Sequence, residues 1–374
     1  MRVILLYRHR PGRVELSTIN SSFVCTTPDG QTSLLRQGER WIVELADGGW
    51  RILRPGTGSF GPKGAGDYAR FTAQGPWGKI IIKCLEGQSG EPAVAVSRGD
   101  LLLSSGARGL LLMDEIGLEA YLSGVLPEEI SARFPEEALR VQCIVSRTFA
   151  LSERGRHGKE GADFCDNSHC QVYGAGDRYP SLDGALQATR GQVLTYKGAL
   201  ARVFYHSSCG GHTLSAGALW RTDLDLPYLK GVSDQERGKP FCREASNSRW
   251  TRVISSDELS SLMGWNEEIQ DIQVVKGDRR DRRSVVVLAG NRGSRRIPLY
   301  EFWTRIVDAL GWGSLGSPWF QVTRQGRRFC FSGRGLGHGV GLCQWGARGM
   351  AKAGYGAEKI LEHYFPETRV GRVK

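Results

Sequence analysis

Two adjacent carboxylates, Glu128 and Glu129, lie in the segment Gly124-Val-Leu-Pro-Glu-Glu-Ile130, which we predict to be a turn between two helices. A carboxylic acid held in a crevice between helices loses solvation, and this loss raises its pKa toward the range that a general acid needs. Only one of two neighbouring side chains can point inward from a tight turn. The segment therefore predicts one acid/base residue, with a solvated turn glutamate as the alternative interpretation.

A second segment, Cys165-Asp-Asn-Ser-His-Cys170, places two thiols five positions apart with a histidine beside the second. Thiolate sulfur and imidazole nitrogen are the usual protein ligands of zinc. We expect Cys165 and Cys170 to bind one zinc ion together with His157 or His169. The spacing is not that of a zinc finger, and two reduced loop cysteines are the alternative.

Two further segments are polar and rich in glycine. In the run 333–341 glycine occupies every second position, with His338 in the middle. A strand of this pattern has no side chains on one face, so a ligand or another backbone can approach it closely. The segment 204–213 contains His206 and Ser207 but lacks the Gly-x-Ser-x-Gly pattern of a nucleophile elbow. We expect both segments to bind a polar ligand; a flexible linker is the alternative for the first.

A helix at about 135–154 must position part of this chemistry. It begins with proline at its first position and two glutamates in its first turn, as helix N-termini favour. Its residues are apolar nearly all round, which predicts a buried helix. Arg140 and Arg147 are seven positions apart and share one face. A buried arginine needs an anionic or carbonyl partner, whereas arginines that reach solvent along one edge are the alternative.

The surrounding elements indicate an α+β fold. Residues 1–106 form a β-rich N-terminal region of short, half-buried antiparallel strands separated by turns. We expect residues 107–374 to form a mixed α/β core, in which 235–330 is a candidate inserted subdomain; the family resemblance described below makes this core the catalytic part. Besides the buried helix, we expect helices at 118–125, 181–188, 256–263, 299–310 and 357–364, and strands at 192–196 and 201–206.

Composition limits the class of protein. The 374 residues are 40% hydrophobic and 24% charged, as in soluble globular domains. No apolar run approaches the ~18 residues of a membrane span, and no signal peptide is visible. The nine cysteines, odd in number and unevenly spaced, do not suggest a disulfide framework.

The formal net charge of +11 is concentrated in segments 276–296 and 324–334. Such a surface attracts polyanions, although a solvated basic face is the alternative. The sequence contains no nucleic-acid-binding module, so we expect no nucleic-acid partner.

Six ordered motifs together resemble the stage II sporulation protein D (SpoIID) family. The resemblance extends from about Asp100 to Pro366. Its motifs are Tyr121–Ile130, Phe134–Gln142, Ser146–Leu151, Cys165–Tyr173, Tyr205–Thr213 and Gly333–Gln344.

The resemblance implies a lytic transglycosylase that cuts peptidoglycan glycan strands, preferably those stripped of stem peptides, and leaves 1,6-anhydro-MurNAc ends. It makes Glu129, five positions after Gly124, the catalytic acid. Arg140 and Arg147 match the family's basic positions and would orient Glu129 or the lactyl carboxylate of the substrate. One carboxylate suffices because the 6-hydroxyl of the substrate, rather than water, attacks the anomeric carbon; ordinary glycosidases need two.

The resemblance also implies a substrate-binding set, a metal and partners. The substrate-binding residues, which we expect to line one groove with Glu129, are Arg140, Arg147, Gln171, Tyr173, His206, Ser207 and His338. Some members bind zinc through one histidine and two cysteines, here His157, Cys165 and Cys170, in a structural role; no organic cofactor is expected. The expected partners are glycan strands and a cell-wall amidase, and the substrate indicates a location in the cell envelope.

The chain departs from the family pattern at a few positions. Pro127 stands where a small residue is usual, Ile130-Ser131 replaces Met-Pro, and Cys209 and Cys343 replace serines. Three other functions remain open: a non-enzymatic enhancer of a cell-wall amidase, a zinc hydrolase using the Cys165 site, and a basic nucleic-acid binder. Release of anhydro-sugars would argue against the non-enzymatic enhancer. Chelator-sensitive hydrolysis would indicate the zinc hydrolase, and salt-dependent DNA binding would indicate the nucleic-acid binder.

Overall fold

The computed structural model describes residues 1–46, 49–54, 56, 58–61, 68–90, 92–174, 176–220, 226–246, 248–276 and 284–373. The chain forms two compact units, each built from two stretches of sequence. The N-terminal unit comprises Met1–Ala132 and Glu153–Arg190, and the C-terminal unit comprises Arg133–Ser152 and Gly191–Lys374. The fold is α+β with a β-rich N-terminal part, as predicted. The domain boundary at residue 107 and the subdomain 235–330 stay predictions.

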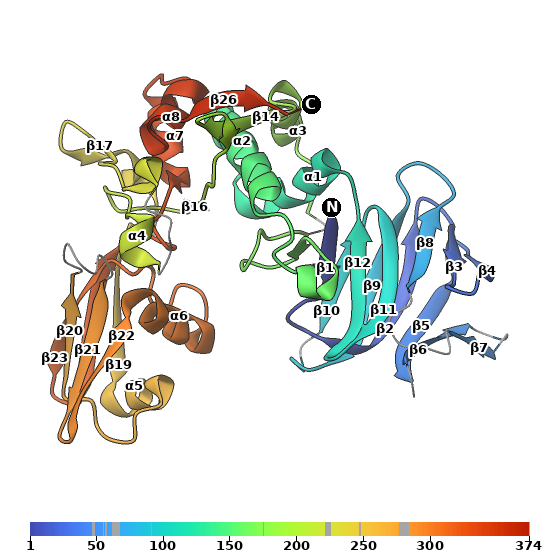
Figure 1. The fold of residues 1–374 in the computed structure, drawn as a ribbon, viewed down its shortest axis with the longest axis horizontal. Helices are drawn as coiled ribbons and strands as arrows, with labels where there is room; N and C mark the ends of the chain where they lie inside the picture. The colour runs from blue at the N-terminus through green and yellow to red at the C-terminus, as the bar shows by residue number, and fades with distance from the viewer. Residues whose placement is uncertain are drawn as a thin grey trace. The chain divides into compact units, whose positions relative to one another are not determined.

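Two antiparallel sheets make up most of the N-terminal unit (Figure 1). The first contains, in spatial order, β13 (Phe164–Cys165), β1 (Arg2–Leu5), β12 (Gly109–Glu115), β11 (Asp100–Gly106), β8 (Ala69–Ala73), β3 (Phe23–Thr26) and β4 (Thr32–Leu35). The second contains β10 (Ala93–Ser97), β9 (Lys79–Gly87), β2 (Pro11–Ile19), β5 (Arg40–Ala46), β6 (Gly49–Arg54) and β7 (Gly58–Phe60). Strands β11 and β12 contact β2, β5 and β6, so the two sheets pack on each other. Within these two sheets, β13 pairs with β1 in parallel, and the other described pairings are antiparallel.

Buried and partly exposed residues alternate along these strands, and this alternation explains how the two sheets pack on each other. In β2, Val14 and Leu16 are buried while their neighbours are partly exposed, and in β5 Trp41 and Val43 repeat the pattern. Successive side chains of a strand point to opposite faces, so one face of each sheet supplies the core. The predicted half-buried antiparallel sheet is confirmed.

The helices of the N-terminal unit are α1 (Leu118–Glu129), α3 (Pro180–Ala188) and the 3-10 turn η1 (Gly158–Glu160). The prediction that the first helix ends at Val125, before a turn, is wrong: α1 continues through Pro127 to Glu129. Proline has no backbone N–H, so the last turn of α1 lacks one helical hydrogen bond. The helix then stops because Ile130 is extended, with φ −141° and ψ 142°.

The C-terminal unit is a mixture of helices and small sheets (Figure 1). Its helices are α2 (Glu136–Ser152), α4 (Ala216–Leu219), α5 (Ser256–Met263), α6 (Leu299–Leu310), α7 (Gln344–Lys352) and α8 (Ala357–Tyr364), with 3-10 turns η2 (Pro227–Leu229) and η3 (Phe241–Glu244). Its three-stranded sheets are β15 (Ala199–Leu200), β14 (Gln192–Tyr196), β26 (Arg369–Arg372); β19 (Arg249–Ser255), β24 (Arg328–Arg334), β23 (Phe320–Gln325); and β20 (Asp271–Val275), β21 (Val285–Gly290), β22 (Gly293–Pro298). Its paired short strands are β16 (Tyr205–His206) with β25 (Leu342–Cys343), and β17 (Gln235–Glu236) with β18 (Lys239–Pro240).

The predicted buried helix is confirmed as α2, in which every residue from Val141 to Ala150 is buried. Helices α5, α6 and α8 also fall where the sequence predicts them. The strand expected at 201–206 shrinks to the two residues of β16. A separate apolar core within the C-terminal unit packs α6 against β19, β21 and β24, with Phe302, Ile306 and Phe331 fully buried.

The glycine-rich run is not the side-chain-free strand that we expected. Strand β24 ends at Arg334, and the four following alternate glycines, Gly335, Gly337, Gly339 and Gly341, have φ between +74° and +101°. Other residues rarely adopt this left-handed backbone. The glycines are therefore needed for a winding path rather than for a bare strand face. At Gly335 and Gly341 a Cβ atom would also collide with the backbone of Ser208 and Phe204.

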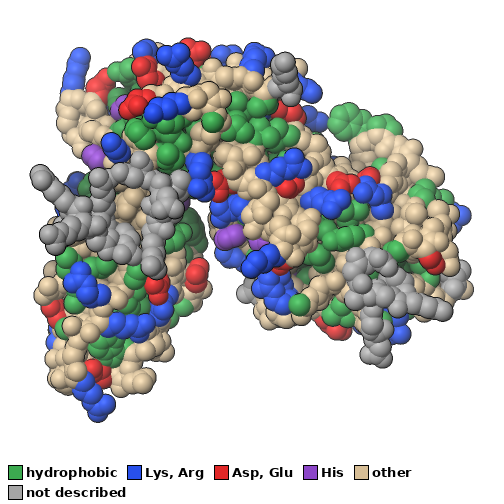
Figure 2. Space-filling model, viewed as in Figure 1, with side chains coloured by type: hydrophobic (Ala, Val, Ile, Leu, Met, Phe, Trp, Pro, Cys, Tyr) green, Lys and Arg blue, Asp and Glu red, His purple; other side chains and the backbone are tan. Residues whose placement is uncertain are grey.

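The basic residues do not gather into a single patch on the face shown in Figure 2, where Lys and Arg side chains are scattered among acidic ones. Arg324 and Arg327 pair with Glu268 and Asp257, respectively. Residues 277–283, in the first basic segment, lie outside the described residues. Among the helices that the structure describes, none has the length and apolarity to cross a membrane.

Candidate functional site

The two candidate acids differ in their surroundings. Glu129 ends α1 and is partly buried, and its Oε1 accepts a hydrogen bond of 2.7 Å from the backbone amide of Val172. Glu128 is exposed, and its carboxylate lies where a Cβ on Gly174 or Gly176 would be. Consecutive side chains on a helix point ~100° apart, so the two acids cannot share one environment. Of the pair, Glu129 is the one whose carboxylate has a backbone hydrogen bond in the described part of the chain.

The segment 171–176 forms the support for Glu129 by packing along α1. The amide of Gly174 donates to the carbonyl of Gly124 at 3.2 Å. Gly124 has no side chain, and the ring of Tyr173 occupies the space where its Cβ would stand. The ring of Tyr121 stacks on Tyr173 with centroids 5.4 Å apart. These contacts fix the Val172 amide relative to the end of the helix.

A buried carboxylate that the sequence analysis missed anchors this segment. The hydroxyl of Tyr173 donates to Asp114 at 2.6 Å, and Asp114 also accepts from the Ser97 hydroxyl and the amides of Arg98 and Gly99. Burial raises the pKa of Asp114, against the lowering effect of these donors. Burial, and then the charge of Asp114, raise the pKa of Tyr173 above its ordinary value. The only signal available in the sequence was an acidic pair, Asp114-Glu115, directly after the apolar run Leu110–Met113.

Two of the expected substrate-binding residues are interior. Tyr173 is 5% exposed, and Gln171 is fully buried with its Oε1 3.3 Å from the Tyr121 hydroxyl. Their polar atoms are engaged inside the N-terminal unit. Both side chains are placed to orient the segment that holds Glu129.

The loop that precedes this segment brings together four metal-binding side chains. One ligand atom from each of His157, Cys165, His169 and Cys170 lies within 4.8 Å of every other. The Nδ1 of His169 is 3.8 Å from the Cys165 sulfur and 3.5 Å from the Cys170 sulfur. Hydrogen bonds from the Cys165 thiol and from His169 lower the pKa of Cys170, which favours the thiolate that a metal requires. The set fits a tetrahedral ion.

His157 is oriented as a metal-ligating histidine would be. Its Nδ1 lies 2.7 Å from Glu160, which also pairs with Arg10 and Arg108. Its Nε2 is buried and has no hydrogen-bond partner among the described residues. A carboxylate on one ring nitrogen, with the other turned toward a metal position, is the arrangement usual around protein-bound zinc.

The two arginines of α2 have different environments. Arg147 is fully buried, and its guanidinium donates to the carbonyls of Cys143 at 3.4 Å and Gln192 at 3.2 Å. The carbonyl partners expected for a buried arginine are thus present. Arg140 is partly exposed and pairs with Glu136 and Glu137 in the first turn of the same helix.

Two histidines meet in the C-terminal unit, where β16 pairs with β25. The rings of His206 and His338 are 5.6 Å apart, and Val340 bonds to both. The carbonyl of Val340 accepts a hydrogen bond from Nδ1 of His206. The other ring nitrogen of His206, the buried Nε2, therefore carries a lone pair, and it has no hydrogen-bond partner in the described part of the chain. Burial, helped by the charge of His338, lowers the pKa of His206 to about 3. Burial lowers the pKa of His338 to about 4. Both rings are neutral near pH 7.

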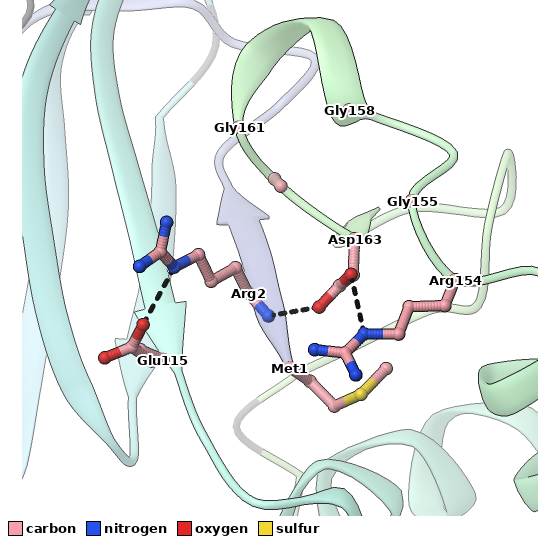
Figure 3. Close-up of a pocket in the computed structure, with 9 residues that line it drawn as sticks. Met1, Arg2, Glu115, Arg154, Gly155, Gly158, Gly161 and Asp163 are labelled. Carbon is pink, nitrogen blue, oxygen red and sulfur yellow. Dashed lines mark hydrogen bonds and ion pairs between the residues drawn. The ribbon is translucent and has the colours of Figure 1, made fainter.

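A pocket of about 420 Å³ lies elsewhere in the N-terminal unit (Figure 3). Asp163 lines the pocket and accepts hydrogen bonds from the Arg2 amide and from Arg154, while the Arg2 side chain pairs with Glu115. It contains none of the predicted site residues, and its charges are already paired. We therefore assign the candidate site to the end of α1 and not to this pocket.

The structure thus brings Glu129, Gln171 and Tyr173 together with the Cys165 loop in the N-terminal unit. Arg140, Arg147, His206, Ser207 and His338 belong to the C-terminal unit. A single groove lined by both sets stays a prediction.

Comparison with known proteins gives the class of protein. Residues 107–196, which carry α1, α2 and the Cys165 loop, match the family model "SpoIID: Stage II sporulation protein". An uncharacterized protein of Brachyspira hyodysenteriae is 29% identical over 262 residues, which are 68% of this chain and 67% of that protein. Stage II sporulation protein D of Bacillus subtilis is 27% identical over 276 residues, 69% of this chain and 75% of that protein. The amidase enhancer of Bacillus subtilis is 28% identical over 291 residues, 66% of this chain but only 40% of that protein.

The chain thus resembles the SpoIID family, whose model matches residues 107–196. The resemblance found in the sequence motifs is confirmed.

Proposed function

We propose that this protein is a cell-wall enzyme, a lytic transglycosylase that cleaves the bond between MurNAc and GlcNAc in peptidoglycan glycan strands. The observation that carries the proposal is the setting of Glu129. Glu129 is a partly buried acid at the end of α1, and it accepts a hydrogen bond from the Val172 amide. The segment that contains Val172 is in turn anchored by the hydrogen bond from Tyr173 to Asp114. A catalytic acid needs a fixed position more than it needs many contacts.

In the proposed reaction Glu129, in its protonated form, donates its proton to the glycosidic oxygen as that bond breaks. The resulting carboxylate accepts the proton of the substrate's 6-hydroxyl, whose oxygen forms the new bond to the anomeric carbon. The acid is regenerated, no water enters, and the product has a 1,6-anhydro end. One carboxylate therefore performs both proton transfers.

The supporting residues have separate roles in this proposal. Gln171 and Tyr173 act by positioning, because their polar atoms are engaged inside the N-terminal unit. His206, Ser207, His338 and Arg140 bind the sugar polymer, with Arg140 attracting the lactyl carboxylate of bare MurNAc. Arg147, buried on α2, orients the site through the backbone carbonyls that it holds.

We also propose that His157, Cys165 and Cys170 bind a zinc ion, with His169 completing the tetrahedron. The buried, unpartnered Nε2 of His157 and the carboxylate behind its Nδ1 support this assignment. Four protein ligands leave no open position, so the ion would order the loop that leads to Gln171 and Val172 and would not take part in the reaction.

Product analysis tests the reaction. The purified protein is incubated with peptide-free glycan strands, and the products are examined by mass spectrometry. Transglycosylation predicts ends lighter by one water than the ends that hydrolysis gives. Reducing MurNAc ends would instead support a zinc hydrolase, and chelation should then abolish the activity.

The match to the amidase enhancer favours a second candidate function, the binding of wall and of an amidase without cleavage. This alternative predicts no glycan product. It predicts instead that adding the protein accelerates peptide release from intact peptidoglycan by a cell-wall amidase. Under either function the partners are glycan strands and an amidase, and we propose a location in the cell envelope.

A further inference from the structure

A second group of metal-binding side chains lies in the C-terminal unit, whereas the loop of Cys165 belongs to the N-terminal unit. It consists of Cys209, Asp234, Cys242 and Cys343, all buried, with one ligand atom from each within 4.8 Å of every other. Four separate segments supply them: the turn after β16, the stretch before β17, the 3-10 turn η3, and the end of β25. We call these residues the Cys3Asp cluster.

The distances within the Cys3Asp cluster suit a single tetrahedral ion. Zinc binds thiolate sulfur at ~2.3 Å and carboxylate oxygen at ~2.0 Å, so a tetrahedron places two sulfurs about 3.8 Å apart and a sulfur and an oxygen about 3.5 Å apart. The sulfurs of Cys209 and Cys242 are 3.8 Å apart. The Cys209 sulfur is 3.1 Å from Oδ2 of Asp234. A modest expansion would admit the ion.

Groups around the cluster hold its ligands in orientation. The amides of Cys209 and Gly346 donate to the sulfur of Cys343 at 3.3 Å and 3.2 Å. The amide of Gly211 donates to the sulfur of Cys209 at 3.4 Å. The hydroxyl of Tyr364 donates to Oδ1 of Asp234, which leaves Oδ2 facing the sulfurs. Such hydrogen bonds to the ligands are a regular feature of protein metal sites.

Burying the four acidic side chains of the Cys3Asp cluster together is unfavourable in free energy unless a cation is bound. Three thiols and a carboxyl group are gathered in the interior, each no more than 3% exposed. Of the hydrogen bonds and ion pairs that the structure describes for these four side chains, none comes from lysine or arginine. A buried acidic group is normally paired with a positive charge or coordinated to a metal. Soft thiolate ligands select zinc over calcium or magnesium.

From this geometry we infer that Cys209, Asp234, Cys242 and Cys343 bind one zinc ion, separate from the zinc proposed at Cys165 and Cys170. Four protein ligands close the coordination sphere, so the role is structural. The ion would tie the polar turn that follows His206 to η3 and to the start of α7, where the Cys343 sulfur caps the helix by accepting from Gly346. The inference does not depend on the proposed enzymatic activity.

A disulfide is the main rival for this arrangement. A disulfide bond needs sulfurs ~2.05 Å apart, whereas those of Cys209 and Cys242 are 3.8 Å apart, and all nine cysteines are free. A disulfide would also leave Cys343 and Asp234 buried together without a partner of opposite charge.

The experiment counts metal in the full chain, purified under reducing conditions without added chelator. In the variant Cys165→Ser/Cys170→Ser the Cys3Asp cluster is intact and is the site under test. We expect it to keep about one zinc per chain by elemental analysis, and after exchange with cobalt to show thiolate-to-cobalt charge-transfer absorption. Adding Cys209→Ser and Cys242→Ser should remove this metal, whereas adding Cys330→Ser, a thiol in β24 outside the cluster, should not.

Because the first measurement leaves the cluster unaltered, misfolding of the cluster variant cannot decide the result. The inference is overturned if Cys165→Ser/Cys170→Ser holds no zinc and shows no cobalt charge transfer. It is equally overturned if intact mass shows the loss of two hydrogens from a Cys209–Cys242 disulfide, or if the bound metal is iron.

Discussion

The contact between α1 and the segment 171–176 can be tested by adding one methyl group. Gly124 lies within α1, and a Cβ there would stand 2.5 Å from Cε2 of the Tyr173 ring and 3.3 Å from the Gly174 carbonyl oxygen. Overpacking of this kind costs about 1–3 kcal/mol, against about 1 kcal/mol gained when alanine replaces glycine in a helix. We therefore expect Gly124→Ala to lower the free energy of unfolding by roughly 0–2 kcal/mol.

Gly184 provides the matched control, because it lies within α3 in the same unit and a Cβ there meets nothing within 4 Å. Gly184→Ala should stabilise by about 0.5–1 kcal/mol. The two variants should therefore move the unfolding midpoint in urea, followed by circular dichroism, in opposite directions or at least by clearly different amounts.

Activity on peptide-free glycan strands completes this test. In Gly124→Ala the displaced Tyr173 ring should move the Val172 amide from Glu129, so kcat should fall while Gly184→Ala keeps the parent kcat. Misplacing a catalytic group by about 1 Å can lower the reaction rate about 100-fold. If Gly124→Ala is as stable and as active as Gly184→Ala, the segment does not position the acid and our reasoning is wrong.

Three further predictions concern the surroundings of the site. Tyr173→Phe removes the hydrogen bond to the Asp114 carboxylate. It should lower the free energy of unfolding, measured in urea, by about 1.5–3 kcal/mol, and it should lower kcat while KM stays unchanged. A change in KM alone would indicate that Tyr173 contacts the substrate instead. His206 has its pKa lowered to about 3 in the folded chain, while the unfolded chain takes up the proton near 6.5. Its contribution should therefore reduce the free energy of unfolding by about 1.4 kcal/mol per pH unit as pH falls below 6.5, and His206→Asn should give a shallower slope; equal slopes would refute the buried neutral ring. Glu160→Gln weakens the support of His157 and should lower zinc affinity at the Cys165 loop by about 10–100-fold in chelator competition, whereas an unchanged affinity would remove His157 from the ligand set.

Local patterns predicted the elements that depend on local forces. Helices α2, α5, α6 and α8 follow from apolar periodicity and helix-start signals, and the burial of Arg147 follows from its place on an apolar helix. Helix α7 was missed because it carries Gly346 and Gly349, which lower helix propensity. In the folded chain a Cβ at these positions would collide with Tyr364 and with the Phe241 carbonyl. Close packing, invisible in the sequence, explains these glycines.

Long-range partners were equally invisible. Asp114 and Tyr173 meet across 59 positions, and four segments converge on the Cys3Asp cluster; neither arrangement has a local signature. The four candidate ligands of the Cys165 loop lie within one stretch of 14 residues, His157 to Cys170, so a local pattern could point to them. Groups of residues that are close in the sequence could be predicted, whereas groups that the fold assembles from distant segments were missed.

The central claim is that Glu129 alone supplies the acid, and the paired variants Glu129→Gln and Glu128→Gln test it most directly. Glutamine keeps the size of the side chain and can still accept from the Val172 amide, so the fold and glycan binding should persist in both. General acid catalysis contributes about 10²–10⁴-fold, so Glu129→Gln should lose nearly all release of 1,6-anhydro ends from peptide-free strands, while Glu128→Gln stays close to the parent rate. Release by Glu129→Gln at near the parent rate, or loss of activity in Glu128→Gln alone, would contradict the account.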